Sequence, residues 1–200
     1  MRVHCEALQV KTSGEFDVID VTSDVEKAVV NSEIDDGYVL VFSRHTTFAI
    51  LLNEKESGLL VDASRLLSQL VPACNGYLHD DFEIRTENMH PDEPPNAQAH
   101  LRQILAGHSS EYIPVANRAL MLGTWQRIML VEFDRPRERE VLIQVCGICR
   151  RTTALNGRRK DRDADEVTGF VAVGDVSKGE LLRVGVETGR EARFGSDDQR

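Results

Sequence analysis

The order of hydrophobic and polar residues predicts a chain that begins with alternating strands. Apolar and polar positions alternate over residues 2–11 and 16–21, which is typical of strands because successive side chains point to opposite faces. Uninterrupted apolar runs at residues 38–42 and 46–52 predict buried strands. The same criteria predict further strands at residues 112–115, 119–122, 125–133 and 140–146.

Apolar residues at helical spacing predict three helices between these strands. Ser23-Asp24-Val25-Glu26 has the pattern of a capping box, and we expect the helix that it opens to end at Gly37. Residues 58–70 place apolar side chains on one helical face before Pro72, and residues 96–105 form the third predicted helix. Strands outnumber helices and neighbouring strands have short links, which favours an α+β fold of packed antiparallel sheets.

Charge divides the chain near residue 147. The 200 residues carry a net charge of −9, yet residues 1–147 hold 13 basic and 23 acidic side chains, whereas residues 148–200 hold 11 and 10. We therefore predict a domain over residues 1–147 and an extension over residues 148–200, flexible in part. Within that extension, residues 156–166 read as a solvated charged linker, and weak alternation over residues 169–186 is compatible with a β-hairpin.

Composition excludes several classes of protein. The acidic balance argues against a general nucleic-acid binder, which needs a basic surface. No apolar run approaches the roughly 20 residues that span a bilayer, and the N-terminus lacks a signal-peptide core, so a cytoplasmic protein without a membrane partner is expected. Cys146 and Cys149 have suggestive spacing, but a zinc site would need a second pair, so we interpret them as reduced thiols.

Three histidines occur beside carboxylates and supply the ingredients of a divalent metal site. His45 follows a buried strand, His79 lies in an irregular stretch from residue 73 to residue 95, and His100 shares a helix face with Asn96. Imidazole suits zinc, and a nearby carboxylate fixes its tautomer. Each histidine can equally be a surface or capping residue, since the sequence has no histidine pair at i, i+4 spacing.

Strand geometry limits which polar residues can share one site. In regular strands Gln126 would lie roughly 20 Å from Glu132, and His45 roughly 26 Å from Asn53. One compact site therefore cannot use all four unless strands bend or chains meet. A site shared between subunits is one answer, and a site that uses only some of these residues is the other.

Three segments carry a resemblance to a known family. They are FSRHTTFAILLNEKE at residues 42–56, LVPACNGYLHDDFEIRTENMHPDEPPNAQAHL at residues 70–101, and LGTWQRIMLVEFD at residues 122–134. In this combination the chain, up to about Gly147, resembles the YjbQ-like family, which is associated with a secondary thiamine-phosphate synthase activity. The sequence departs from the family's usual Asp-Gly-Pro-Arg at Asp134-Arg135-Pro136-Arg137, and residues after Gly147 lie outside its pattern.

The resemblance implies an α+β fold, a homotrimer and a polar cleft that holds a divalent metal, zinc or magnesium. It implies His79 and His100 as metal ligands with His45 as the third. Glu54 or Glu132 would act as the acid or base. The remaining residues carried over or added as candidates are Asn53 and Gln126 for catalysis, Thr46, Arg44, Asp80 and Arg137 for substrate binding, and Asp62 without an assigned role.

Two functions remain open at this point. By resemblance, the protein would be a transferase that joins a pyrimidine diphosphate to a thiazole phosphate, with arginines such as Arg44, Arg137 and Arg139 contacting phosphate. These arginines can equally form surface salt bridges. The alternative is a non-catalytic trimeric metal- or ligand-binding protein, because no Ser-His-Asp order or activated cysteine indicates covalent catalysis.

Overall fold

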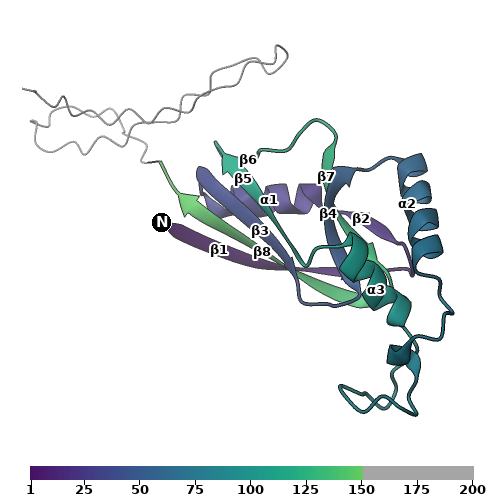
Figure 1. Cartoon of the computed structure of the whole chain (residues 1–200). Helices are drawn as coiled ribbons and strands as arrows, with labels where there is room; N and C mark the ends of the chain where they lie inside the picture. Colours follow the sequence, from purple (N-terminus) through teal and green to yellow (C-terminus); the bar gives the residue numbers. More distant parts are fainter. Residues whose placement is uncertain (151–200) are drawn as a thin grey trace, which may run out of the picture. The chain divides into compact units, whose positions relative to one another are not determined.

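A computed structural model describes residues 1–150 and contains, in that part, two antiparallel sheets and three α-helices (Figure 1). The strands follow the alternating and continuous apolar runs, so the predicted α+β fold is confirmed. The larger sheet has the order β1 (Arg2–Lys11), β8 (Glu138–Ile148), β3 (Asp36–Ser43), β5 (Ser110–Ala116) and β6 (Ala119–Leu120), and the smaller one has β2 (Val18–Asp20), β7 (Gln126–Glu132) and β4 (Phe48–Glu54).

The first helix differs from its prediction at both ends. The helices are α1 (Thr22–Ser32), α2 (Ser57–Leu70) and α3 (Ala97–Ala106), with a 3₁₀ turn, η1, at Leu78–Asp80. The capping box is wrong, because α1 begins at Thr22, whose backbone N–H donates to the side chain of Asp20 at 3.0 Å. Asp20 thus satisfies the free N–H of the first residue of the helix, which lies one residue before the predicted cap at Ser23.

Gly37 does not end α1 but lies inside β3, opposite Gly147 of β8. The helix ends at Ser32, and Glu33 takes the left-handed conformation with φ of 57°. Gly37 has φ of +159°, and a Cβ atom there would lie 2.0 Å from the carbonyl oxygen of Cys146. A glycine is therefore required by the close approach of β8 rather than by a helix end.

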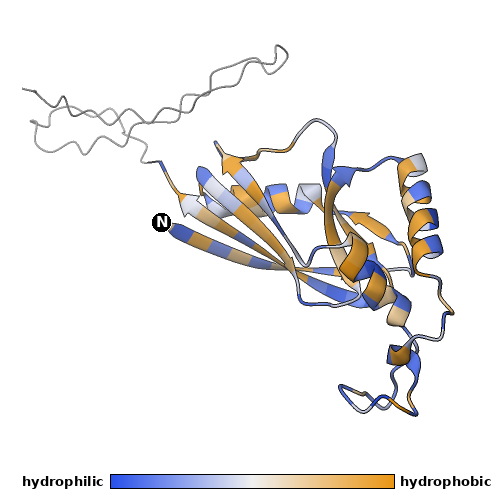
Figure 2. Ribbon diagram, viewed as in Figure 1, coloured by the Kyte–Doolittle hydropathy of each residue, from blue (hydrophilic) through white to orange (hydrophobic). Residues whose placement is uncertain are grey.

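The main core lies between the two sheets and is closed by α1. Val39, Val41 and Ile143 of the larger sheet, with Ile50 and Leu130 of the smaller one, belong to a single buried cluster, to which α1 adds its apolar face. Figure 2 shows the matching alternation of hydrophobic and hydrophilic residues along the strands. The sheets consequently present fixed edges and ends on which loops can place polar side chains.

The third helix packs on the other face of the smaller sheet. Ala99 joins a second buried cluster with Val131 and Phe133. Arg102, on the same helix, is buried and donates to the carbonyl oxygen of Val71 through Nε at 3.2 Å and Nη2 at 2.9 Å. These bonds fix α3 against the end of α2, from which the long loop of residues 71–96 departs.

In residues 1–150 no helix is long and apolar enough to cross a membrane. β8 ends at Ile148, one residue after the boundary predicted at residue 147. The predicted charged linker and β-hairpin of the extension fall outside the described residues.

Candidate functional site

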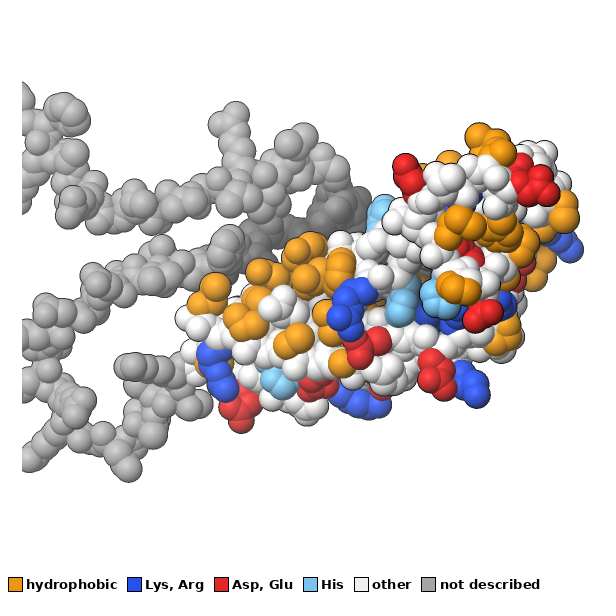
Figure 3. Space-filling model, turned by 90° about the horizontal axis from the view of Figure 1, so that it is seen from below, with side chains coloured by type: hydrophobic (Ala, Val, Ile, Leu, Met, Phe, Trp, Pro, Cys, Tyr) orange, Lys and Arg blue, Asp and Glu red, His pale blue; other side chains and the backbone are white. Residues whose placement is uncertain are grey.

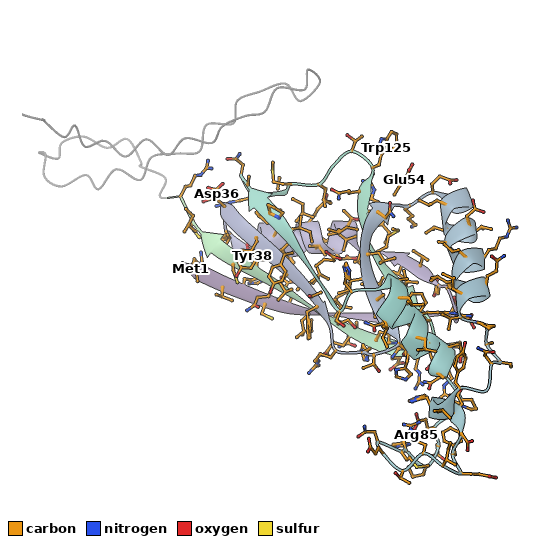
Figure 4. All side chains as sticks on the ribbon, viewed as in Figure 1. Met1, Asp36, Tyr38, Glu54, Arg85 and Trp125 are labelled. Atoms are coloured by element: carbon orange, nitrogen blue, oxygen red, sulfur yellow. The ribbon has the colours of Figure 1, made fainter. Side chains whose placement is uncertain are left out.

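A cleft of about 740 Å³ opens where the long loop meets α3. The loop that the sequence singled out supplies most of its wall, α3 supplies His100, and the segment before β4 supplies Thr46. In Figure 4 the label of Arg85 shows where this loop lies. The residues that line the cleft are Thr46, Leu78, His79, Ile84, Arg85, Thr86, Glu87, Asn88, Glu93 and His100.

Two of the three predicted metal ligands meet in this cleft. The ring centroids of His79 in η1 and His100 in α3 lie 4.7 Å apart, with an interplanar angle of 62°. Burial, followed by the charge of His79, lowers the pKa of His100 below its ordinary value of 6.5. His100 is therefore a neutral imidazole at pH 7, which is the form that binds a metal ion.

Asp80 joins the two histidine-bearing segments. Its Oδ1 atom accepts the backbone N–H groups of Asn96 and Ala97, both at 2.9 Å, at the start of α3. Asn96 provides no cap through its own side chain, so the carboxylate of the loop satisfies the helix terminus. The geometry thus gives Asp80 a positioning role for His79 and His100, where the sequence suggested substrate binding.

Arg85 and Glu93 complete the cluster, and sequence reasoning did not single them out as site residues. Oε1 of Glu93 lies 3.6 Å from Nε2 of His79 and accepts from Nη1 of Arg85 at 2.8 Å. The bond from Arg85 lowers the pKa of Glu93. One sequence signal could have found the pair: Arg85 is the only Lys or Arg between Arg65 and Arg102, in a loop rich in acids.

Arg137 is bound at the start of α3 rather than in the lining of the cleft. Its Nη2 donates to Oδ2 of Asp134 at 2.6 Å, and the same oxygen accepts from Nδ2 of Asn96 at 3.4 Å. The other amide atom of Asn96, Oδ1, is buried and accepts no hydrogen bond within the described part. Arg137 therefore supports the helix that carries His100.

Glu132 lies in a separate, sealed cluster. It is fully buried, and Arg139 donates to it twice, from Nε at 2.7 Å and from Nη2 at 2.6 Å. Thr12 and the backbone N–H of Asp134 donate to the same carboxylate at 3.0 Å and 2.9 Å. With every oxygen engaged and no exposure, Glu132 holds β7 to β8 and cannot exchange protons with a molecule in the cleft.

His45, the expected third ligand, lies near the sealed cluster and not in the lining of the cleft. Its Nε2 accepts the backbone N–H of Glu140 at 3.1 Å, and its ring meets Phe48 edge-on at 6.2 Å. Burial, followed by the charge of Arg139, lowers the pKa of His45. Its neighbour Arg44 is exposed and pairs with Glu140. Of this stretch only Thr46 lines the cleft.

The remaining predicted residues are not brought to the cleft. Asn53 and Glu54 close β4, where Glu54 is the register partner of Gln126, and Figure 4 shows Glu54 at the end of the sheet away from Arg85. Oε1 of Gln126 accepts the backbone N–H of Gly123 at 2.8 Å and so closes a turn. Asp62 is exposed on α2, 3.7 Å from Arg65.

The side chains of His79, His100 and Glu93 are of the types that bind zinc, although the three are not arranged around one point. Two imidazoles and one carboxylate are typical zinc ligands. The separation of 3.6 Å between Nε2 of His79 and Oε1 of Glu93 is close to the roughly 3.4 Å between two ligands of a tetrahedral zinc ion with bonds of about 2.1 Å. Within residues 1–150, no three His, Cys, Asp or Glu side chains stand ready to hold a metal as they are.

Comparison with known proteins identifies the family. A model of the family described as UPF0047 protein YjbQ-like matches residues 6–148. The chain belongs to this family. A UPF0047 protein of Archaeoglobus fulgidus is 42% identical over 137 residues, which cover 68% of this chain and 97% of the relative. One of Methanothermobacter thermautotrophicus is 39% identical over 147 residues, with 74% and 94% covered.

Solved structures of other YjbQ-like proteins share the fold. A protein of Sulfolobus solfataricus, described as YbjQ-like and of unknown function, superposes with a TM-score of 0.65 at 32% identity and covers 74% of this chain and 99% of its own. A Clostridium acetobutylicum family member gives 0.61 at 34% identity, with 70% and 99% covered. The resemblance and the fold class inferred from the sequence are thereby confirmed.

Proposed function

We propose that this YjbQ-like chain binds a divalent metal ion, zinc or magnesium, at His79 and His100 and acts on a small phosphorylated molecule in the adjoining cleft. The contact between the two rings, 4.7 Å from centroid to centroid, carries this proposal. Zinc suits the histidines better than magnesium, which prefers oxygen ligands.

The reaction that we propose is a thiamine-phosphate synthase-like transfer, in which a pyrimidine diphosphate is joined to a thiazole phosphate and pyrophosphate is released. A bound metal would offset the charge of the leaving diphosphate. The chain itself offers the guanidinium of Arg85 and the hydroxyl groups of Thr46 and Thr86 in the lining of the cleft. These groups are the candidates for a local anion site in a chain that is acidic overall. We place the protein in the cytoplasm.

A non-catalytic metal- or ligand-binding protein is the second candidate, and one observation favours it. Neither of the predicted acid or base residues lies in the cleft: Glu132 is sealed with Arg139, and Glu54 closes the far end of β4. Binding of the metal without turnover of the phosphorylated molecule would support this candidate.

We further propose that the chain assembles as a homotrimer, with exposed apolar surface as support. No residue of the amphipathic helix α2 is buried, and Leu66 and Leu70 are 55% and 62% exposed. On the outer face of the larger sheet, Tyr38 and Tyr112, whose ring centroids lie 5.6 Å apart, are 43% and 62% exposed. Figure 3 shows hydrophobic side chains gathered on the surface seen from below. A sedimentation mass near the 22.4 kDa of one chain would exclude the trimer.

Metal analysis of purified variants tests the proposed function. We expect the wild-type protein to bind about one zinc ion per chain, and His79→Ala and His100→Ala each to weaken binding by about 100-fold or more, because each removes a ligand. His108→Ala is the matched control, since its side chain is 73% exposed and does not line the cleft. Unchanged metal content in both ligand variants would contradict the metal site.

An activity assay then separates the two candidate functions. Purified, metal-loaded protein is incubated with the pyrimidine diphosphate and the thiazole phosphate, and formation of thiamine phosphate is measured. Product that disappears in His100→Ala but persists in His108→Ala supports the transferase. Metal binding without product supports the binding protein.

A further inference from the structure

The guanidinium of Arg85 is held by acceptors on every side. Its side chain is 12% exposed. Nε donates to the carbonyl oxygen of Glu87 at 3.1 Å and Nη2 to that of Asn88 at 2.8 Å. Nη1 donates to the carbonyl oxygen of His79 at 3.1 Å and to Oε1 of Glu93 at 2.8 Å. Because arginine does not lose its proton, a permanent positive charge lies inside the cleft wall.

Nη1 faces both of the groups that would ligate a metal ion beside His100. It is 2.8 Å from Oε1 of Glu93 and 3.5 Å from Nε2 of His79, and these two acceptors are 3.6 Å apart. An arginine N–H can only donate, so in this contact Nε2 of His79 accepts with its lone pair in the tautomer that carries its proton on Nδ1, and that is the form in which Nε2 binds metals. Arg85 therefore sets a positive charge beside the two acceptors that a metal ion would use.

A metal ion and the guanidinium cannot share this place. A unit charge and a divalent charge about 3 Å apart repel each other strongly when water is largely excluded. Glu93 also has one carboxylate to offer, which Arg85 engages in the described structure.

We propose that Arg85 is the chain's own cation at the metal position, and that metal binding releases its Nη1 to bind a phosphate group in the cleft. This inference rests on the proposed metal-dependent function and adds to it the residue that recognises the phosphate. Arg85 lines the cleft beside Thr46 and Thr86, so a released guanidinium has hydroxyl groups around it to complete an anion site.

Displacement of Arg85 couples the two ligands. When the metal binds Glu93, Arg85 loses its carboxylate partner. The freed guanidinium then binds an anion more tightly than before. By linkage, an oxyanion must raise the affinity for the metal by the same factor by which the metal raises the affinity for the oxyanion. Without Arg85 the competition disappears, so the metal should bind more tightly and the oxyanion should lose its effect.

Titration with Co²⁺, followed by its visible absorption, tests this coupling in the full chain. Sulfate serves as the oxyanion because it binds Co²⁺ weakly in water. In the wild type we expect sulfate to tighten Co²⁺ binding by about threefold. In Arg85→Gln we expect Co²⁺ to bind about tenfold more tightly than in the wild type, with no effect of sulfate. Arg85→Lys, which keeps the competing charge, should stay within about twofold of the wild type.

Arg65→Gln is the matched control, because Arg65 is exposed on α2 and its ion pair within residues 1–150 is with Asp62. It should behave as the wild type. Weaker or unchanged Co²⁺ binding in Arg85→Gln would overturn the inference and would make Arg85 an organiser of the loop. The wild-type arm needs no variant to fold, and absence of the sulfate effect there also overturns it. Absence of any Co²⁺ binding in the wild type would instead contradict the proposed function itself.

Discussion

The open cleft and the sealed cluster contain the same kinds of residue and behave differently. Each joins an arginine to a glutamate, Arg85 to Glu93 and Arg139 to Glu132, beside a histidine whose pKa is lowered by burial. Glu93 keeps 15% of its side-chain surface, whereas Glu132 keeps none. Access to a ligand, rather than residue type, therefore separates a candidate site from a structural ion pair.

The source of the difference is the element that carries each pair. Arg139 and Glu132 come from neighbouring parts of the strands β7 and β8 and lie in the interior, where a charge must be paired. Arg85 and Glu93 come from a loop, which is tied to α3 by Asp80 but otherwise has few strand or helix bonds. A loop can rearrange around a ligand at a smaller cost in free energy than a sheet, because fewer backbone hydrogen bonds hold it.

Breaking the sealed pair should have the largest effect. Glu132→Gln removes the charge that balances Arg139, and we expect a loss of about 3 kcal/mol or more in the free energy of unfolding, measured with urea. Glu140→Gln, which removes the partly exposed ion pair with Arg44 and keeps an amide oxygen that can still accept from Gln9, should cost less than about 1 kcal/mol. If Glu132→Gln unfolded like the wild type but lost the metal, the sealed cluster would belong to the metal site.

Removing the tie between the loop and α3 should have a smaller effect on stability. Asp80→Ala leaves two backbone N–H groups of α3 without their acceptor, and we expect a loss of about 1 kcal/mol in the free energy of unfolding. Because the tie sets the spacing of His79 and His100, zinc affinity should fall by about tenfold. Asp80→Asn keeps an acceptor and should restore most of both.

Asp24→Ala is the control for that experiment. Asp24 lies in the first turn of α1, bonded to Lys27 at 3.0 Å and remote in sequence from the cleft. It should change stability slightly and leave zinc affinity as it is. An equal fall in zinc affinity in both variants would show that lower stability, and not the spacing of the histidines, is the cause.

Acidification should give the smallest effect, in the metal-free protein. Since burial lowers the pKa of His100 below 6.5, the unfolded chain binds more protons there than the folded chain as the pH falls. The contribution of His100 to stability is complete above about pH 6.5 and is lost towards the folded pKa. His100→Gln should thus lose less stability than the wild type between about pH 7.5 and about pH 5.5. An identical loss in both would contradict the lowered pKa.

Local patterns of apolar residues predicted the strands and the helices α2 and α3. The long loop could be predicted because it interrupts those patterns. The capping box and Gly37 were assigned wrongly, because Asp20 and the backbone of β8 contribute contacts that the local sequence does not contain. For the site, residue type and the family resemblance offered His79, His100 and His45 as candidates, and the fold brings the first two together. Arg85 and Glu93 were missed because their meaning comes from where the loop folds back on itself.

By itself, the sequence determined the α+β fold and the family, since period, composition and motif are properties of neighbouring residues, and it offered His79 and His100 as candidates. Only the tertiary structure decided which charged groups face a cleft and which are sealed. Glu132 lies in a strand and its side chain points into the interior, whereas Glu93 lies in a loop and lines the cleft. Burial depends on what packs against a residue from distant parts of the chain, and no local pattern records that packing.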